Sequence, residues 1–136
     1  GAFIVPIGTP SDAQLSAASG GDLTFSEAEG LYSGSVQFTL TNGGSEDAEV
    51  SAIQMMSSSG TVAPDDNWLN QATTMTVNGD DLSLPLAVSA GASVTVTVAV
   101  SGSAGSTWPE AMAYTLRHDA LGAKPLSVRF GVVTPQ

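Results

Sequence analysis

The sequence predicts an all-β domain, an immunoglobulin-like or jelly-roll-like antiparallel β-sandwich of about seven to nine strands with an extended N-terminal strand or arm. Apolar and polar residues alternate in several short segments, which is the period of a strand with one buried face. Turn-forming Gly, Asn, Asp and Ser separate these segments. Neither a helical period of useful length nor an internal repeat is present.

The N-terminal segment, residues 2–7, reads AFIVPI and is apolar on both faces. Pro6 has no amide hydrogen to donate to a central ladder, so we expect an edge strand or an extended arm. Residues 8–21 are rich in Gly and Ser, the composition of a flexible tether. The sequence therefore predicts an arm and tether at residues 1–21 and the sandwich at residues 22–136.

The clearest strand signal lies at residues 35–41, where Val36, Phe38 and Leu40 share one face opposite polar residues. Residues 42–45, Asn-Gly-Gly-Ser, form a strong turn signal after it. The neighbouring segments are weaker. Residues 22–26 predict a short strand, 48–56 a strand with less regular alternation, and 64–69 a single helical turn that begins at acidic residues.

The second half of the chain predicts two hairpins and one long strand. Residues 75–77 and 82–84 flank an Asn-Gly pair, the usual signal for a tight hairpin turn. Residues 93–100 carry four valines on one face and threonines on the other. The last predicted pair is 112–118 with 126–133, whose alternating apolar residues are Met112, Tyr114, Leu116, Leu126, Val128, Phe130 and Val132.

Composition excludes several classes of function. The net charge is −10, from 13 acidic and 3 basic residues, and three scattered cations form no patch for nucleic acid. Without Cys there is no disulfide framework or thiolate site. The sequence has no run of 18 apolar residues, so it predicts no membrane span. A chain that starts with Gly rather than Met suggests a processed, secreted product, extracellular or at a cell surface.

Two segments resemble a known family. SVQFTLTNGGSEDAEVSAI at 35–53 and LPLAVSAGASVTVTVAVSG at 84–102 are similar to the CARDB-like branch of immunoglobulin-type domains. That resemblance covers about half of the chain and consists of turn-and-strand patterns. It implies the fold and a cell-surface setting, and it transfers no catalytic residue.

A second, weaker likeness concerns the arrangement of the chain. An apolar N-terminus, a tether and then an F-x-L-x-N-x-G-S pattern resemble the TasA/camelysin group of biofilm fibres and archaeal bundling pili. In that group the N-terminal arm inserts into the sheet of the neighbouring subunit. The likeness implies a subunit interface made by Ala2, Phe3, Ile4, Val5 and Ile7. The alternative is that residues 2–7 form the first strand of their own domain.

Other candidate sites carry weaker signals. His118 is the only histidine, and without a G-x-S-x-G motif we expect a strand-end residue and no enzyme activity. Acidic pairs in turns are usually solvated, and Asp80 with Asp81 are the first candidates for calcium. Trp68 and Trp108 suit a buried position better than a sugar platform. We therefore expect no cofactor and no resident metal.

These observations lead to one main hypothesis and two alternatives. The main hypothesis is an extracellular structural protein that polymerises with itself into a filament, joined by its N-terminal arm as a donor strand. The first alternative is a decoration or capsid-associated sandwich on a virion. The second is a surface module that binds glycan or calcium.

Overall fold

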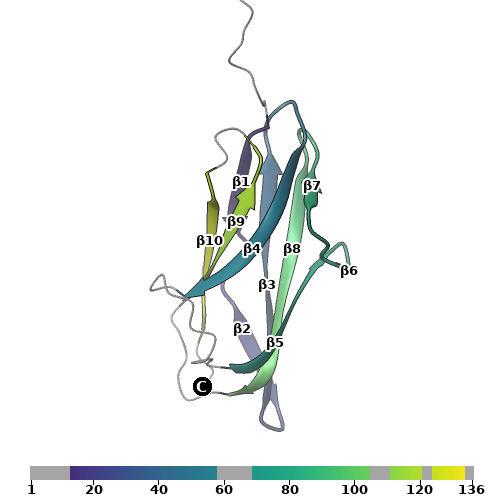
Figure 1. The fold of residues 1–136 in the computed structure, drawn as a ribbon. Helices are drawn as coiled ribbons and strands as arrows, with labels where there is room; N and C mark the ends of the chain where they lie inside the picture. Colours follow the sequence, from purple (N-terminus) through teal and green to yellow (C-terminus); the bar gives the residue numbers. More distant parts are fainter. Residues whose placement is uncertain (1–12, 58–68, 105–110, 121–123, 134–136) are drawn as a thin grey trace, which may run out of the picture.

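The computed structural model describes residues 13–57, 69–104, 111–120 and 124–133, which form two β-sheets packed face to face (Figure 1). The first sheet has the order β1-β3-β8-β5-β6, with β2 also paired to β3. Its strands are β1 (Leu15–Ser19), β2 (Thr24–Ala28), β3 (Leu31–Asn42), β5 (Leu69–Val77), β6 (Asp80–Asp81) and β8 (Ser93–Ala104). The second sheet, β10-β9-β4-β7, contains β4 (Ala48–Ser57), β7 (Leu86–Val88), β9 (Ala111–His118) and β10 (Leu126–Gly131).

The strand order is that of an immunoglobulin-type sandwich. In the usual lettering, β1-β3-β8-β5 correspond to strands A-B-E-D and β10-β9-β4 to strands G-F-C. The predicted all-β antiparallel sandwich is confirmed. The described residues contain more strands than the about seven to nine expected, because β1, β6 and β7 are short segments that follow from pairing with a neighbour.

The core lies between the inner faces of the two sheets and follows the alternation in the sequence. Period 2 places every second side chain of a strand on the same face, so the apolar rows of both sheets meet. Most of the predicted inward residues of β3, β8, β9 and β10 are buried, while Val94 and Leu126 are half-buried and pack against the core. The buried ones are Val36, Phe38, Leu40, Val96, Val98, Val100, Met112, Tyr114, Leu116, Val128 and Phe130. The strongest strand predictions are therefore confirmed.

A β-bulge explains the irregular alternation at residues 48–56. The pairing of β4 with β9 shifts its register between Val50 and Ala52. An extra residue on one strand reverses the facing of the residues that follow it. Val50 is consequently buried, and Ile53, three positions later, also packs against the core.

The expectation of a flexible tether over residues 8–21 is wrong for its second half. Leu15–Ser19 forms β1, which pairs antiparallel with the end of β3 from Leu15↔Asn42 to Ser19↔Phe38. Ala13 is fully buried. Small residues read as a linker by composition, yet they form an edge strand here because β3 offers them a ladder of backbone hydrogen bonds.

The hairpin predicted at Asn78-Gly79 is confirmed at the end of β5. Both residues have positive φ, 55° and 85°, as a type I′ turn requires. Its second strand differs from the prediction, because only Asp80–Asp81 pair with β5 and residues 82–84 form no strand. The chain crosses instead to the second sheet, where β7 pairs with β4. The helical turn expected at 64–69 lies outside the described residues, except that Leu69 begins β5.

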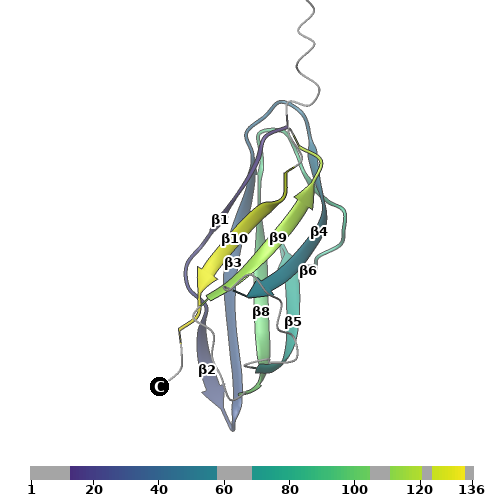
Figure 2. The same ribbon diagram turned by 60° about the vertical axis from the view of Figure 1, so that its left-hand side comes forward.

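One flank of the sandwich is closed by hydrogen bonds between the two sheets. The amide of Leu23, between β1 and β2, donates to the carbonyl of Gly131 at 2.8 Å, and the amide of Val133 donates to the carbonyl of Leu23 at 2.9 Å. β1 and β10 also lie side by side along this flank (Figure 2). The opposite flank is therefore bordered by β5 and β6 from the first sheet and by β4 and β7 from the second.

Candidate intersubunit site

The predicted interface residues Ala2, Phe3, Ile4, Val5 and Ile7 lie outside the described residues. What the structure does describe is the place where a first strand would normally pair. β1 covers the end of β3 from Phe38 to Asn42, and β2 covers its beginning from Leu31 to Ser35. This edge of β3 is therefore occupied along both parts by described strands.

The opposite flank has a strand edge without a strand partner among the described residues. β4 pairs with β9 from Val50 to Ser57, but its other edge meets β7 only from Ala48 to Val50. The outer edge of residues 52–57 therefore has no neighbouring strand within the described part of the chain. Backbone donors and acceptors on such an edge are a template for an added strand.

β5 borders the same flank from the other sheet. It pairs with β8 along its whole length, while β6 covers only Thr76 and Val77 on its outer side. The amide of Leu82 also donates to the carbonyl of Met75 at 2.9 Å. Within the described residues, two incompletely paired strand edges thus face the same flank, one from each sheet.

Half-buried apolar side chains line the open flank. Ile53 of β4, Met75 and Val77 of β5 and Leu86 of β7 all pack against the core while keeping part of their surface in solvent. An apolar strand that covered these side chains would remove more of their surface from water, at about 25 cal/mol per Å². The flank therefore offers both backbone hydrogen bonds and apolar surface.

Asn42, the last residue of β3, is a buried connection between β3, β7 and the neighbouring turns. It is fully buried, its Nδ2 donates to the carbonyls of Val88 at 3.0 Å and Glu46 at 2.7 Å, and its Oδ1 accepts from the amides of Gln14 at 3.1 Å and Gly44 at 3.0 Å. The bond to Val88 ties β7 to the end of β3, and the other three tie Asn42 to its own turn and to the residue before β1. The turn signal at 42–45 indicated Asn42 as a turn residue but not as a buried connection.

The outer face of the first sheet carries small uncharged side chains. Outward residues of β3 and β8 form hydroxyl and amide pairs across the ladder: Gln37 with Thr97, Thr39 with Thr95, and Thr41 with Ser93. Cross-strand pairs of this kind stabilise a sheet modestly. No charged residue lies on this face within the described parts of β3 and β8.

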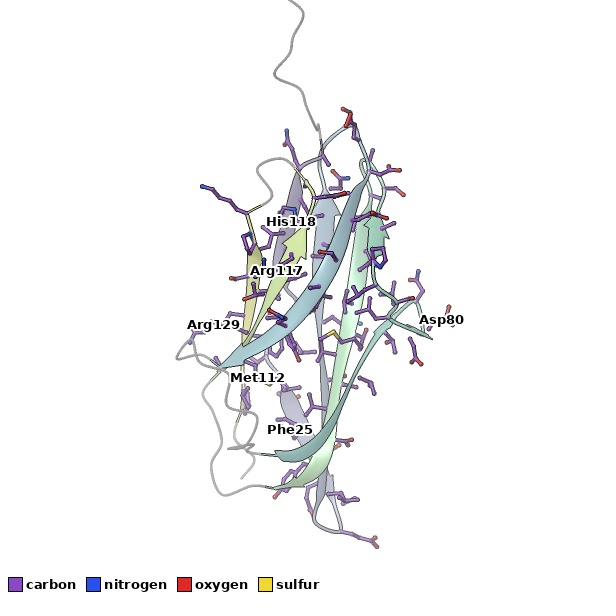
Figure 3. The ribbon with its side chains drawn as sticks, in the orientation of Figure 1. Phe25, Asp80, Met112, Arg117, His118 and Arg129 are labelled. Carbon is purple, nitrogen blue, oxygen red and sulfur yellow. The ribbon has the colours of Figure 1, made fainter. Side chains whose placement is uncertain are left out.

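The basic residues gather in one hairpin, contrary to the scattered arrangement that we expected from composition. Arg117 lies on β9 and Arg129 on β10 (Figure 3). Lys124 lies just before β10, and all three side chains are exposed. Arg117 and Arg129 alternate with buried residues, so both project from the outer face of the second sheet. The hairpin contains every Lys and Arg of the chain, and Asp119 is its only acidic residue.

His118 orders the turn of this cationic hairpin. Its Nε2 donates to the carbonyl of Lys124, with a separation of 2.6 Å, while its Nδ1 accepts from the amide of Ala120 at 3.0 Å. Both ring nitrogens are therefore used in a neutral, Nε2-protonated ring. The prediction of a strand-end residue is confirmed, since His118 is the last residue of β9.

The candidate calcium ligands form an exposed strand edge. Asp80 and Asp81 make up β6, and their backbones pair with Val77 and Thr76. Among the described residues, no three His, Cys, Asp or Glu side chains come close enough to hold a metal ion. Asp47, which follows Glu46 in another acidic pair of the sequence, accepts from the amide of Ala90 at 2.9 Å and so connects two segments far apart in the chain. Trp68 and Trp108 lie outside the described residues.

Tyr114 is a core residue whose pKa is strongly shifted. It stands in the core between Phe38 and Phe130, with ring centroids 6.4 and 6.0 Å away. Its buried hydroxyl has no hydrogen-bond partner within the described part of the protein. Burial disfavours the phenolate and raises the pKa of Tyr114 to about 12. The sequence indicated an inward position for this residue but not the missing partner.

Comparisons with known proteins leave the family open. No family model matches the chain, and no curated protein matches it. Among solved structures it is similar to the N-terminal domain of PorA, with 11% identity and a TM-score of 0.49 over 88% of this chain and 97% of that chain. A likeness this distant carries no argument about function. The CARDB-like and TasA-like resemblances therefore stay predictions.

The described residues also contain no helix that is long and apolar enough to cross a membrane.

Proposed function

We propose that this protein is an extracellular structural subunit that polymerises with itself through donor-strand complementation. Residues 2–7 of one copy add as a strand along residues 52–57 of β4 in the next copy. The observation that carries the proposal is the outer edge of β4, which has no strand partner beyond Val50 among the described residues.

The dimensions and chemistry of the two segments agree. In extended conformation, residues 2–7 and residues 52–57 each span about 20 Å at ~3.3 Å per residue. Alternation puts Phe3, Val5 and Ile7 on one face of the arm, which can cover Ile53 and the other half-buried side chains of the flank. Pro6 is compatible with the added position because an edge strand has one side free of ladder bonds.

Polymerisation follows from the type of contact. The arm and its acceptor are different surfaces of the same chain, so the contact is heterologous and continues from copy to copy unless the rotation closes a ring. The pairing of β1 and β2 with β3 also supports exchange, because the usual place of a first strand is filled within the domain.

Electron microscopy of negatively stained protein tests the proposal. We expect filaments from the full chain and folded monomers from a variant that lacks residues 1–7. A sharper pair is Val5→Asp, which puts a charge on the apolar face of the arm, and Thr9→Asp, which adds the same charge to the tether. Val5→Asp should abolish filaments while Thr9→Asp keeps them. Folded monomers from all four proteins would refute the filament and favour a decoration or ligand-binding module.

A further inference from the structure

We infer that the cationic β9–β10 hairpin of one copy docks on the acidic β5–β6 hairpin of the next, so that complementary charge orients the joint between successive subunits. This inference rests on the proposed polymer and adds a second contact to it. The partner is a second copy of this chain, and the contacting groups are Arg117, Lys124 and Arg129 on one side and Asp80 and Asp81 on the other.

The first observation is the segregation of charge. All Lys and Arg residues lie between positions 117 and 129, whereas all but one of the 13 acidic residues lie elsewhere in the chain. Within the described residues, none of the three cations forms a hydrogen bond or ion pair through its side chain, although the molecule carries a net charge of −10. The cations are therefore exposed and available to a partner.

The second observation is the position of the two hairpins. β10 borders the closed flank, and β6 borders the open flank at the far side of the other sheet. Figure 3 accordingly shows Arg129 and Asp80 on opposite sides of the molecule. Groups on opposite sides pair between copies that follow one another, which gives a contact that does not close on itself.

The third observation links the cations to the arm. Ala13, the first described residue of the chain, is buried against Ala48 and Ala120. Ala120 follows the end of β9, in the turn that His118 orders by its bond to the Lys124 carbonyl. The point at which the described chain begins therefore lies beside the cationic hairpin. A copy that inserts its arm into a neighbour brings this hairpin toward the open flank, where Asp80 and Asp81 lie.

Whether three cations can attract a second copy of a molecule with a net charge of −10 depends on screening by salt. At an ionic strength of 0.15 M the Debye length is about 8 Å, so distant like charges are largely screened while groups in contact still interact. At 1 M it falls to about 3 Å and the contact itself weakens. In very dilute salt the repulsion between whole molecules opposes assembly. We therefore expect filament assembly to be fastest at intermediate ionic strength.

Charge reversal on the full-length chain tests the contact. The variant Asp80→Lys/Asp81→Lys and the variant Arg117→Glu/Arg129→Glu should each slow assembly at 0.15 M salt by about tenfold or more, because like charges then face each other. The chain that carries all four substitutions restores complementarity between copies and should regain most of the wild-type rate. Glu29→Lys/Glu46→Lys makes the same change in net charge as Asp80→Lys/Asp81→Lys, at other exposed positions, and should not slow assembly.

Light scattering gives the rate, and circular dichroism checks that each variant is folded. If single-side reversals assemble like the wild type, or if the fourfold variant is not rescued, the hairpin contact is wrong while the arm-mediated filament stands. Loss with Arg117→Glu/Arg129→Glu alone would assign the cations to a different acidic partner and also overturn the inference. If the wild type forms no filaments, the proposed function fails. Sedimentation of the same variants at low and intermediate salt then still tests the hairpin contact, because its loss would change weak self-association.

Discussion

At the scale of single residues, two buried side chains show how polar groups in this core are handled differently. Asn42 satisfies both halves of its amide, because two backbone amides face Oδ1 and two carbonyls face Nδ2. Tyr114 leaves its hydroxyl without a partner in the described residues. An unsatisfied buried polar group costs free energy, whereas a fully bonded one specifies a single arrangement of the chain around it. Substitutions at the two sites should therefore have opposite effects.

Replacing Asn42 should destabilise the fold. Asn42→Ala leaves two amides and two carbonyls without their partner, and we expect a loss of about 2–4 kcal/mol in the free energy of unfolding. Asn42→Asp should be worse at neutral pH, because a carboxylate would face the carbonyls of Glu46 and Val88. Urea unfolding measures both, with the exposed neighbour Thr41→Ala as the control. A loss at Asn42 no larger than at Thr41 would contradict the role of the amide.

Tyr114→Phe should be neutral or stabilising at pH 8 and should remove a pH dependence. Since the pKa of Tyr114 is raised to about 12 from an unfolded value near 10, its contribution is complete below pH 10 and is lost as the pH rises through 12. The loss is about 1.4 kcal/mol at pH 11 and about 2.7 kcal/mol well above pH 12.

Urea unfolding of both proteins at pH 8 and pH 11 measures this effect. The wild type should lose more stability than Tyr114→Phe between the two pH values, because the two proteins differ only at residue 114. Equal losses would show that the Tyr114 phenolate is not disfavoured in the folded state.

At the scale of elements, the hairpin of β2 and β3 depends on a close approach at Gly34. Phe25 pairs directly with Gly34. A Cβ at Gly34 would overlap the Thr24 carbonyl oxygen and lie 3.0 Å from Cδ1 of Phe25. The glycine therefore lets an aromatic side chain of the neighbouring strand cover this point of β3.

Gly34→Ala should lower the free energy of unfolding by roughly 1–3 kcal/mol, because the added methyl meets backbone that can move only with its strand. Gly43→Ala is the matched control, since a Cβ there meets nothing within 4 Å. Thermal unfolding followed by circular dichroism compares the two. The same melting temperature for both variants would contradict the close approach.

At the scale of the whole molecule, the two flanks of the sandwich are unlike. Leu23 ties the sheets together on the side of β1 and β10, while the edges of β4 and β5 are covered only in part by described strands on the other side. The sandwich is therefore asymmetric, with one closed flank and one open flank. The charges follow the same asymmetry, because the cations lie toward β10 and the acidic hairpin lies at β6.

The two contacts of the proposed polymer depend on different forces. The arm contact uses backbone hydrogen bonds and apolar burial, which depend little on salt. The hairpin contact uses exposed charges, which are screened. Salt should therefore change the rate and regularity of assembly more than it changes the stability of a subunit contact in which the arm is already inserted.

The sequence by itself determined the elements whose information is local. Alternation at 35–41, 93–100, 112–118 and 126–133 identified the strands and their inward faces, because period 2 is a property of the strand alone. The Asn78-Gly79 turn was equally readable, since only a few residue types adopt its positive φ values.

Only the tertiary structure decided what depends on pairing between distant segments. β1 has the composition of a linker and becomes a strand because β3 is beside it, and the irregular pattern of β4 needs its register against β9 to be understood. The same holds for the candidate site. The unpaired edge of β4, the bonds of Asn42 and the opposition of Arg129 and Asp80 join residues far apart in the chain, and no local pattern encodes which strand edge is left without a partner.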